Sequence, residues 1–343
     1  MVHKNIVTLI VTVIAIVQHL ANPTFAQEPF YKGKTIRIVV ATSAGGGFDT
    51  YTRTLTRHRG KFIPGNPAFV VENMPGAGHL IGANHVYKVA KPDGLTLGHF
   101  QGGLFLYQVF GRPGIEFDAK QFEFIGSPIK ESRACAFTKA SGITSVEKWL
   151  ASKPPVKLGG IGGAAPDDIA RMLAAMTALP IQLVAGYKGT SEIRMAAESG
   201  ELAGGCWTWD SIRATWTKAI QSGDAVVVLQ LVSKPHPELA NVPLAQSLAK
   251  SDEARQLIQA GVQDPADYYR PYVLPPRTPK DRVEILCKAL QDTMKDPEFL
   301  ADAAKSRLDI DPVTGTELEN LVRGLFKLSP SMINKLKTIL LPS

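Results

Sequence analysis

Hydrophobic positions along the chain change repeatedly between two spacings. Short runs of β-branched and apolar residues, typical of buried strands, alternate with stretches in which apolar residues recur every three or four positions, as in amphipathic helices. From Lys34 onward this alternation predicts an α/β fold in two sets of elements, each a mostly parallel sheet with right-handed crossovers. The first set is expected to have strands at 35–41, 69–71 and 95–98 with helices at 48–59 and 80–89, and the second set strands at 156–158, 181–185, 202–207 and 225–231 with helices at 167–178, 191–199 and 212–221.

The last third of the chain has a helical pattern without accompanying strands. Its helices are therefore expected to pack on the first set of elements, and Thr278 followed by Pro279 fits the N-cap and first position of the first of them. Extended segments near 124–137 and 268–274 link the two sets, and such a double crossover between two lobes is a candidate hinge. The predicted helices are 279–295, 297–305 and 317–340.

The first 26 residues carry a different pattern. Lys4 precedes the apolar run 6–17, and Thr24 and Ala26 occupy the −3 and −1 positions of a cleavage site, as in a secretion signal. The alternative is an uncleaved membrane anchor, but the apolar run is shorter than the roughly 20 residues that a spanning helix needs. The mature chain is expected to begin near Gln27 and to be exported.

Composition agrees with a folded, two-lobed protein. Of the 343 residues, 45% are hydrophobic and 20% are charged, which excludes disordered, fibrous and polytopic membrane proteins. The chain is longer than the roughly 100 to 200 residues of one typical domain. We expect lobe one to comprise 27–127 and 268–343, and lobe two to comprise 128–267.

Charge narrows the range of partners. The chain carries 38 basic and 31 acidic residues, a net charge of +7. No cluster of Lys and Arg with interleaved aromatics stands out, so nucleic acid is not an expected partner. A diffuse positive charge suits small anions, although it equally serves solubility.

Three cysteines, Cys135, Cys206 and Cys287, lie far apart and without the spacing of metal ligands. Export brings an oxidising compartment, in which one pair at most can close. We expect Cys135 and Cys206 to form it, since Cys287 lies in a helical pattern as a buried free thiol. No metal or cofactor is expected.

Two glycine-rich turns, 41–49 (ATSAGGGFD) and 72–79 (ENMPGAGH), each follow a strand and precede a helix. At such places the unpaired N–H groups and the positive end of the helix bind anions, and glycine allows a close approach to the backbone. Neither turn matches a dinucleotide or phosphate-loop motif. The two turns either share one carboxylate site or are tight turns without a ligand. His79 either assists in binding the carboxylate or is a surface residue.

The second set of elements repeats this arrangement at 159–168 (GGIGGAAPDD). Asp167 or Asp168 is expected to cap the following helix, with a ligand contact as the alternative. Segments 187–190 (YKGT) and 206–210 (CWTWD) also follow strands and supply aromatic and polar groups to the same cleft, with one of the two tryptophans in the core. Hydrolase and metalloenzyme motifs are missing, so binding is favoured over catalysis, and a secreted α/β enzyme is the alternative.

The stretch 34–84, with KTIRIVVATSAGGGFDT and FVVENMPGAGHLIGAN, resembles the opening of the tripartite tricarboxylate transporter substrate-binding proteins, the Bug or TctC-like family. The resemblance continues through 92–97, 159–163, 187–190 and the helical end of the chain. It implies a monomeric, non-enzymatic periplasmic protein with a Venus flytrap fold. Such a protein closes on a small organic carboxylate and delivers it to integral-membrane transporter subunits. A periplasmic ligand sensor or adaptor is a further alternative.

The resemblance also implies a division of the site. The loops 42–49 and 76–79 hold one carboxylate through backbone N–H groups and bridging waters. Lobe two contacts the distal end of the ligand and sets the specificity there. The sequence departs from the family pattern at 41–44, His79 and 165–168. These departures leave four classes of ligand open: an aromatic acid, a hydroxy acid, an amino acid and a tricarboxylate. The candidate ligand-binding residues are Thr42, Ser43, Ala44, Gly45, Gly46, Gly47, Phe48, Asp49, Gly76, Ala77, Gly78, His79, Gln101, Gly162, Gly163, Ala164, Asp167, Tyr187, Thr190, Trp207 and Asp210.

Overall fold

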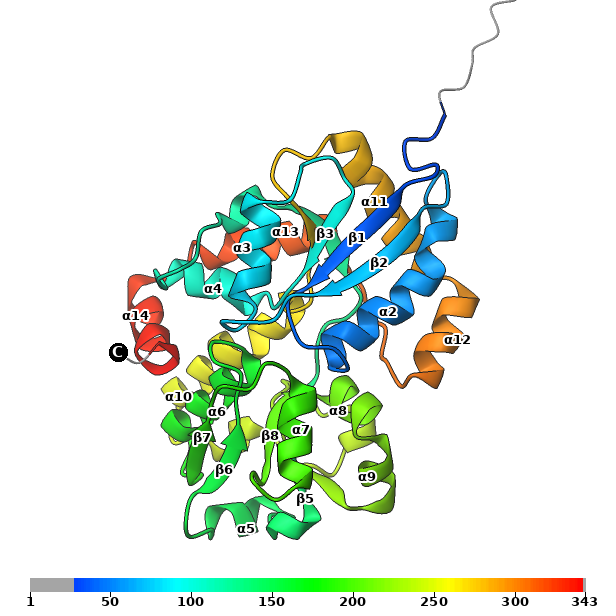
Figure 1. Ribbon diagram of the computed structural model, residues 1–343. Coiled ribbons are helices and arrows are strands. Elements are labelled where there is room, and N and C mark those ends of the chain that lie inside the picture. The colour runs from blue at the N-terminus through cyan, green and yellow to red at the C-terminus, as the bar shows by residue number, and fades with distance from the viewer. Residues whose placement is uncertain (1–27, 342–343) are drawn as a thin grey trace, which may run out of the picture.

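The computed structural model describes residues 28–341 and has two lobes, each built on one mixed β-sheet with flanking helices (Figure 1). This confirms the predicted two-lobed α/β fold. The secretion signal predicted at 1–26 lies outside the described residues. None of the helices within 28–341 combines the length and the apolar character that crossing a bilayer demands.

The sheet of lobe one has the order β11-β4-β10-β3-β1-β2. β1 is parallel to both β2 and β3, whereas β10 runs antiparallel to β3 and β4, and β11 antiparallel to β4. The central strand β1 has the sequence TIRIVV, and its apolar side chains are buried because helices cover both faces of the sheet. The strands are β1 (Thr35–Val40), β2 (Ala68–Asn73), β3 (Thr96–His99), β4 (Glu123–Ser127), β10 (Tyr272–Leu274) and β11 (Val313–Thr314).

The sheet of lobe two has the order β7-β6-β8-β5-β9. β6 is parallel to β7 and β8, and β5 is antiparallel to β8 and β9. Cys135 and Cys206 lie directly opposite each other on β5 and β8 and form the predicted disulfide. The strands are β5 (Arg133–Thr138), β6 (Val156–Gly159), β7 (Ile181–Val184), β8 (Gly204–Thr208) and β9 (Ala225–Gln230).

The prediction of mostly parallel sheets is wrong for both lobes. The segments near 124–137 and 268–274, expected to be linkers, contribute β4, β5 and β10 and pair antiparallel. The chain therefore enters each sheet as it crosses between the lobes. The sequence does not predict β5 as a strand, because RACAFT lacks a run of β-branched residues.

Helices cover both sheets. In lobe one, α11 and α12 pack on α2, and α13 packs on β4. Lobe one has α2 (Gly47–Arg59), α3 (Leu80–Lys88), α4 (Gly103–Val109), α11 (Lys280–Thr293), α12 (Pro297–Lys305) and α13 (Gly315–Leu325). Lobe two has α5 (Val146–Leu150), α6 (Ala165–Met176), α7 (Thr190–Glu198), α8 (Trp209–Thr215), α9 (Thr217–Ser222) and α10 (Asp252–Ile258). Single-turn helices lie at Gly60–Phe62, Ala119–Gln121, Lys139–Ser141, Pro237–Leu239, Ala245–Leu248, Gln259–Gln263 and Asp264–Tyr268.

Three helix predictions need correction. The segment 212–221 belongs to two helices, α8 and α9, which meet at Trp216. The segment 317–340 is also two helices, because Ser329 caps a new helix that has Pro330 at its first position. The N-cap of α11 is Pro279 rather than Thr278, whose hydroxyl donates to the Pro275 carbonyl at 2.9 Å instead.

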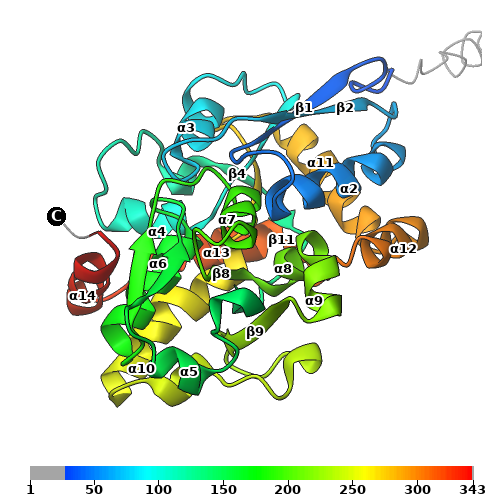
Figure 2. The same ribbon diagram turned by 60° about the horizontal axis from the view of Figure 1, so that its bottom comes forward.

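The last helix, α14 (Pro330–Leu340), packs on α6 and α10 of lobe two, so the prediction that all the C-terminal helices lie on lobe one is wrong for this helix. Figures 1 and 2 show α14, in red, beside these helices. Leu336 is fully buried at this contact, beside Gly261. Lys335 also forms an ion pair with Glu253 on α10. The chain thus passes between the lobes three times, at 128–132, near 268–271 and at 326–329.

Candidate functional site

A cavity lies where the two lobes meet, with about 400 Å³ of space between protein atoms that includes space open to solvent. Its wall comes from the ends of strands and the starts of helices in both lobes, together with the returning hinge segment. This is the position at which open α/β sheets bind ligands. The lining residues are Thr42, Gly47, Phe48, His79, Ile161, Ala164, Ala165, Pro166, Thr190, Trp207, Thr208, Ser211, Tyr269 and Arg270.

Three helices of 9 to 13 residues, α2, α6 and α7, begin at this cavity. Their N-cap residues are Gly46, Ala164 and Gly189, and none of the three supplies a capping side chain. First-turn N–H groups of a helix have no partner within the helix, and the N-terminal end carries partial positive charge. In α6 the Ala165 N–H already donates to the Tyr269 hydroxyl at 2.8 Å and Pro166 has no N–H, so this helix contributes mainly its partial positive charge. Free N–H groups of α2 and α7, together with the three positive helix ends, therefore favour a bound anion.

The first glycine-rich loop is held in shape by Asp49, which is buried. Its carboxylate accepts hydrogen bonds from Gly45 N (2.9 Å), Arg53 Nε (2.9 Å) and Asn73 Nδ2 (3.0 Å). Burial acts to raise the pKa of Asp49, but these hydrogen bonds together hold the pKa below its usual value. Asp49 does not line the cavity, so its role in this structure is to fix the loop that presents Gly47.

His79 ends the second loop and lines the cavity. It is buried, which corrects the interpretation of it as a surface residue, and its φ of 71° places it in the left-handed region. Burial, with the nearby charge of Arg270, lowers the pKa of His79 to about 3, so the ring is neutral. Its Nδ1 accepts a hydrogen bond from Gln101 N at 3.2 Å. The ring proton is therefore on Nε2, which makes His79 a donor.

The glycines of the two lobes meet across the cleft. A Cβ added to Gly47 would overlap the Ser211 hydroxyl, and one added to Gly78 would overlap the carbonyl of Gly162. A Cβ added to Gly189 of lobe two would overlap the Ser43 hydroxyl. Backbone therefore packs on the opposite lobe at these points, and glycine is required there by the close approach.

Hydrogen bonds along the same seam join the lobes. Thr42 Oγ1 donates to Lys188 O at 3.2 Å, and Ser191 Oγ donates to Ala44 O at 3.3 Å. Gln101 Nε2 reaches across to Gly163 O at 2.6 Å. The structure is therefore closed over the cavity.

Asp168 on α6 makes a further bond between the lobes, with the Tyr107 hydroxyl on α4. Burial raises the pKa of Asp168 to about 7; the hydrogen bond from Tyr107 opposes this shift, and the charge of Asp167 adds to it. The prediction that one of these acids caps α6 is wrong. The N-cap is Ala164, and both acids lie in the first turn without a capping hydrogen bond.

Arg270, in the returning hinge segment, is a buried charge that the sequence interpretation missed. Its Nε lies 2.7 Å from Glu131 Oε1, in the outgoing hinge segment. Its Nη2 donates to Thr208 Oγ1 (3.0 Å) and to Ser211 Oγ (2.8 Å) of lobe two. The guanidinium carbon also lies 4.5 Å from the centre of the Phe48 ring in lobe one. Arg270 thus connects both hinge segments and both lobes at the back of the cavity.

The structure divides the candidate residues into two groups. Those that line the cavity are Thr42, Gly47, Phe48, His79, Ala164, Thr190 and Trp207. Those that lie outside its wall are Ser43, Ala44, Gly45, Gly46, Asp49, Gly76, Ala77, Gly78, Gln101, Gly162, Gly163, Asp167, Tyr187 and Asp210. Tyr187 donates its hydroxyl to Glu201 at 2.6 Å, away from the cavity. Ile161, Ala165, Pro166 and Thr208 also line it, within the segments 159–168 and 206–210 that the sequence assigned to the cleft. Lining residues that the sequence interpretation did not identify are Ser211, Tyr269 and Arg270.

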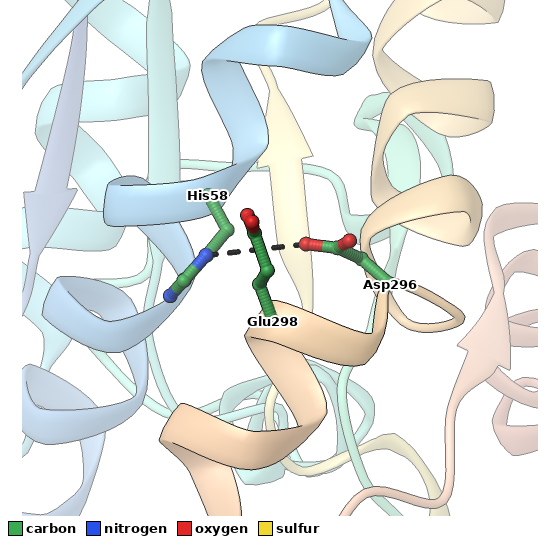
Figure 3. A group of neighbouring side chains, drawn as sticks. All are labelled: His58, Asp296 and Glu298. Atoms are coloured by element: carbon green, nitrogen blue, oxygen red, sulfur yellow. Dashed lines mark ion pairs between the residues drawn. The ribbon is translucent and has the colours of Figure 1, made fainter.

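Elsewhere, His58, Asp296 and Glu298 lie close enough together to suggest a metal site (Figure 3). The Lys61 ammonium, however, lies 2.7 Å from Asp296 Oδ2 and 2.6 Å from Glu298 Oε2. Asp296 also caps α12 by accepting from Phe299 N. A cation of the protein already occupies this group, so we assign no metal to it.

Sequence comparisons find short similarities to two bacterial proteins. No protein-family model matches the chain. It is 39% identical over 77 residues to a UPF0065 protein of Cupriavidus necator, which covers 22% of this chain and 23% of the relative. It is 28% identical over 127 residues to a UPF0065 protein of Bordetella bronchiseptica, which covers 37% of each chain. The matches therefore span well under half the length of these relatives.

Structural comparisons extend over most of the chain. The periplasmic binding protein BugD matches with a TM-score of 0.71 and 21% identity, over 90% of this chain and 98% of BugD. MatC from Rhodopseudomonas palustris with bound malate matches with a TM-score of 0.68 and 17% identity, over 88% and 99%. An R. palustris protein with adipate matches with a TM-score of 0.70 and 17% identity, over 90% of this chain and 97% of that protein. The chain thus has the fold of the Bug and TctC-type periplasmic binding proteins, which confirms the resemblance identified in its sequence.

Proposed function

We propose that this chain is a periplasmic solute-binding protein of the Bug type that captures a small organic carboxylate between its lobes. The observation that carries this proposal is the convergence of three helix N-termini and one arginine on one cavity between the lobes. Bound malate and adipate in two structural neighbours support the same class of ligand. The neighbours are binding proteins rather than enzymes, which supports a role without catalysis.

Capture proceeds by closure of the lobes. We assign 28–127 and 268–325 to lobe one, and 128–267 to lobe two with α14 added. In the open state the first turns of α2, α6 and α7 face water. A carboxylate that enters the cleft accepts charge-assisted hydrogen bonds from them, each worth about 1.5–3 kcal/mol. The free energy of ligand binding favours closure only through the contacts that the ligand makes with the second lobe.

Delivery completes the proposed role. The closed protein presents the seam between its lobes to integral-membrane transporter subunits, and opening at the transporter releases the carboxylate. Export by the secretion signal predicted at 1–26 would place the protein in the periplasm, where the BugD-like neighbours belong. Co-purification of the full-length protein with membrane subunits only in the presence of ligand tests this step.

The binding function is tested by a thermal-shift screen of the chain from Gln27 onward. The panel contains monocarboxylates, dicarboxylates, tricarboxylates and aromatic acids, with uncharged sugars as controls. A ligand at 100 times its Kd stabilises the native state by about 2.7 kcal/mol, which raises the Tm measurably. Stabilisation by sugars alone, or by no compound, contradicts the proposal. Conversion of the bound acid to a product, followed by NMR, would support the enzyme alternative.

A matched pair of variants locates the binding site. Gly46 precedes α2, and its Cβ position faces Thr190 across the cleft at 3.1 Å. Gly46→Asp therefore introduces a negative charge beside the anion site and should abolish the ligand-induced shift. Gly324 on α13 is exposed and has open space around it, so Gly324→Asp should retain the shift. An unchanged shift in Gly46→Asp contradicts this location of the site.

A further inference from the structure

Among the described residues, the side chains that line the cavity include a positive charge but no carboxylate. Among the described residues that line it, Arg270 is the one charged side chain, and His79 is neutral. Three acids, Asp167, Asp168 and Asp210, lie nearby but outside the wall. Asp210 Oδ2 lies 3.8 Å from Arg270 Nη2, so this acid and Glu131 both form ion pairs with Arg270. The side-chain acceptors in the wall are therefore uncharged hydroxyl groups, such as those of Thr190 and Tyr269.

Arg270 has hydrogen-bond donors without an acceptor among the described residues. Of the five N–H groups on a guanidinium, the two on Nη2 donate to Thr208 and Ser211. Nε lies 2.7 Å from Glu131 Oε1 as an ion pair, without the geometry of a hydrogen bond. The two on Nη1 have no partner among residues 28–341, although Nη1 is fully buried. The side chain as a whole is 2% exposed, so water outside the protein does not satisfy them. A buried donor without a partner beside a cavity indicates that a ligand supplies the acceptor.

We infer that Arg270 binds the ligand carboxylate through Nη1 and that the ligand carries no ammonium group. This inference rests on the proposed function and narrows its ligand class. Arg270 and the first turn of α2 are adjacent, because a Cβ at Gly47 would lie 3.0 Å from Arg270 Nη2. The arginine, the helix end and the His79 donor therefore act on one carboxylate from the same side.

An amino acid is disfavoured by the same geometry. The α-ammonium group is within a few bonds of the carboxylate, so it would lie beside Arg270 and the positive end of α2. No carboxylate of the wall residues is present to compensate its charge. Part of the remaining wall is apolar, with Phe48, Ile161, Pro166 and Trp207, and the other part carries hydroxyl groups. The ligand class is thus a non-amino carboxylic acid with a partly apolar carbon skeleton.

Titration calorimetry with matched pairs of acids on the native protein tests this inference. The pairs are 3-phenylpropionate and phenylalanine, 4-methylpentanoate and leucine, and succinate and aspartate. We expect the non-amino member of a pair to bind at least about 100-fold more tightly. An amino acid that binds within tenfold of its partner overturns the inference and leaves the proposed function intact. Binding of none of the six compounds or of the wider carboxylate panel overturns both.

Two double variants test the residue itself. Arg270→Gln with Glu131→Gln removes the proposed contact and one of the two acids that balance it, while Asp210 remains. Arg133→Gln with Glu131→Gln is the matched control, because Arg133 is also buried and pairs with Glu131 but does not line the cavity. We expect about 10- to 100-fold weaker binding in the first variant only. Equal affinity of the two variants overturns the role of Arg270, and if neither folds, the ligand pairs decide.

Discussion

Ligand affinity should rise as the pH falls, because Asp168 lies in the seam between the lobes and its closed-state pKa is raised to about 7. When the lobes separate, the carboxyl group becomes solvated and its pKa returns toward the usual 3.8. A carboxyl group whose pKa is higher in the closed state takes up a proton on closure. The closed state is therefore fully favoured at low pH and loses stability as the pH rises toward 7.

The magnitude follows from the two pKa values. One pKa unit corresponds to about 1.4 kcal/mol, so the full difference sets a ceiling of about 4 kcal/mol. Between pH 8 and pH 6 the closed state passes from mostly deprotonated to mostly protonated, while the open state stays deprotonated. Closure, and with it the association constant, should strengthen by about tenfold over this interval. Above pH 8 the affinity should level off.

The assay is titration calorimetry at pH 6, 7 and 8 with a ligand that stays ionised throughout. Repeating each titration in buffers of different ionisation enthalpy counts the protons taken up on binding. Asp168→Asn is the matched control, because an amide retains a hydrogen bond to Tyr107 without titrating. His79 has a pKa of about 3 and stays neutral over this range. A flat affinity profile of the native protein, or the same slope in Asp168→Asn, would refute the reasoning.

Three further predictions concern packing. Gly47→Ala should weaken ligand binding about 100-fold in calorimetry, because the added methyl group overlaps the opposite lobe. Gly324→Ala, where there is open space, should leave the affinity unchanged. Equal affinities of the two variants would contradict this. Replacing Cys135 and Cys206 with serine should lower the free energy of unfolding in urea by about 2–5 kcal/mol, and a loss below 1 kcal/mol would contradict it. Leu336→Ala should cost about 2–5 kcal/mol in the same assay, and no loss would show that α14 is not docked.

The sequence predicted those elements whose signal is local. β1 was recognisable from the alternating and then continuous apolar residues of TIRIVV, and α2 from the glycines before it and the basic residues at its end. β5 and β10 carry no such signal, because their burial arises from antiparallel partners that are distant in the sequence. The direction of pairing was therefore the part of the fold that local patterns did not contain.

The same distinction applies to the site. Glycine after a strand is a local signal, so Gly47 and the neighbouring loop were identified. Arg270 was not, because its burial depends on Glu131 and Thr208, which are far from it along the chain. A charged residue within the aromatic run YYRPY, in a segment expected to link the two lobes, was the available signal. A lone charge among aromatic residues predicts a partner elsewhere in the fold.

The facing glycines have a consequence for building chimaeras. Gly47 leaves room for Ser211, Gly78 for the Gly162 carbonyl, and Gly189 for Ser43. Each absent side chain in one half of the molecule is thus matched by an atom of the other half. Recombining lobe one of this chain with lobe two of a relative would preserve both cores and still prevent the halves from meeting. The two halves must therefore be inherited, exchanged or redesigned together.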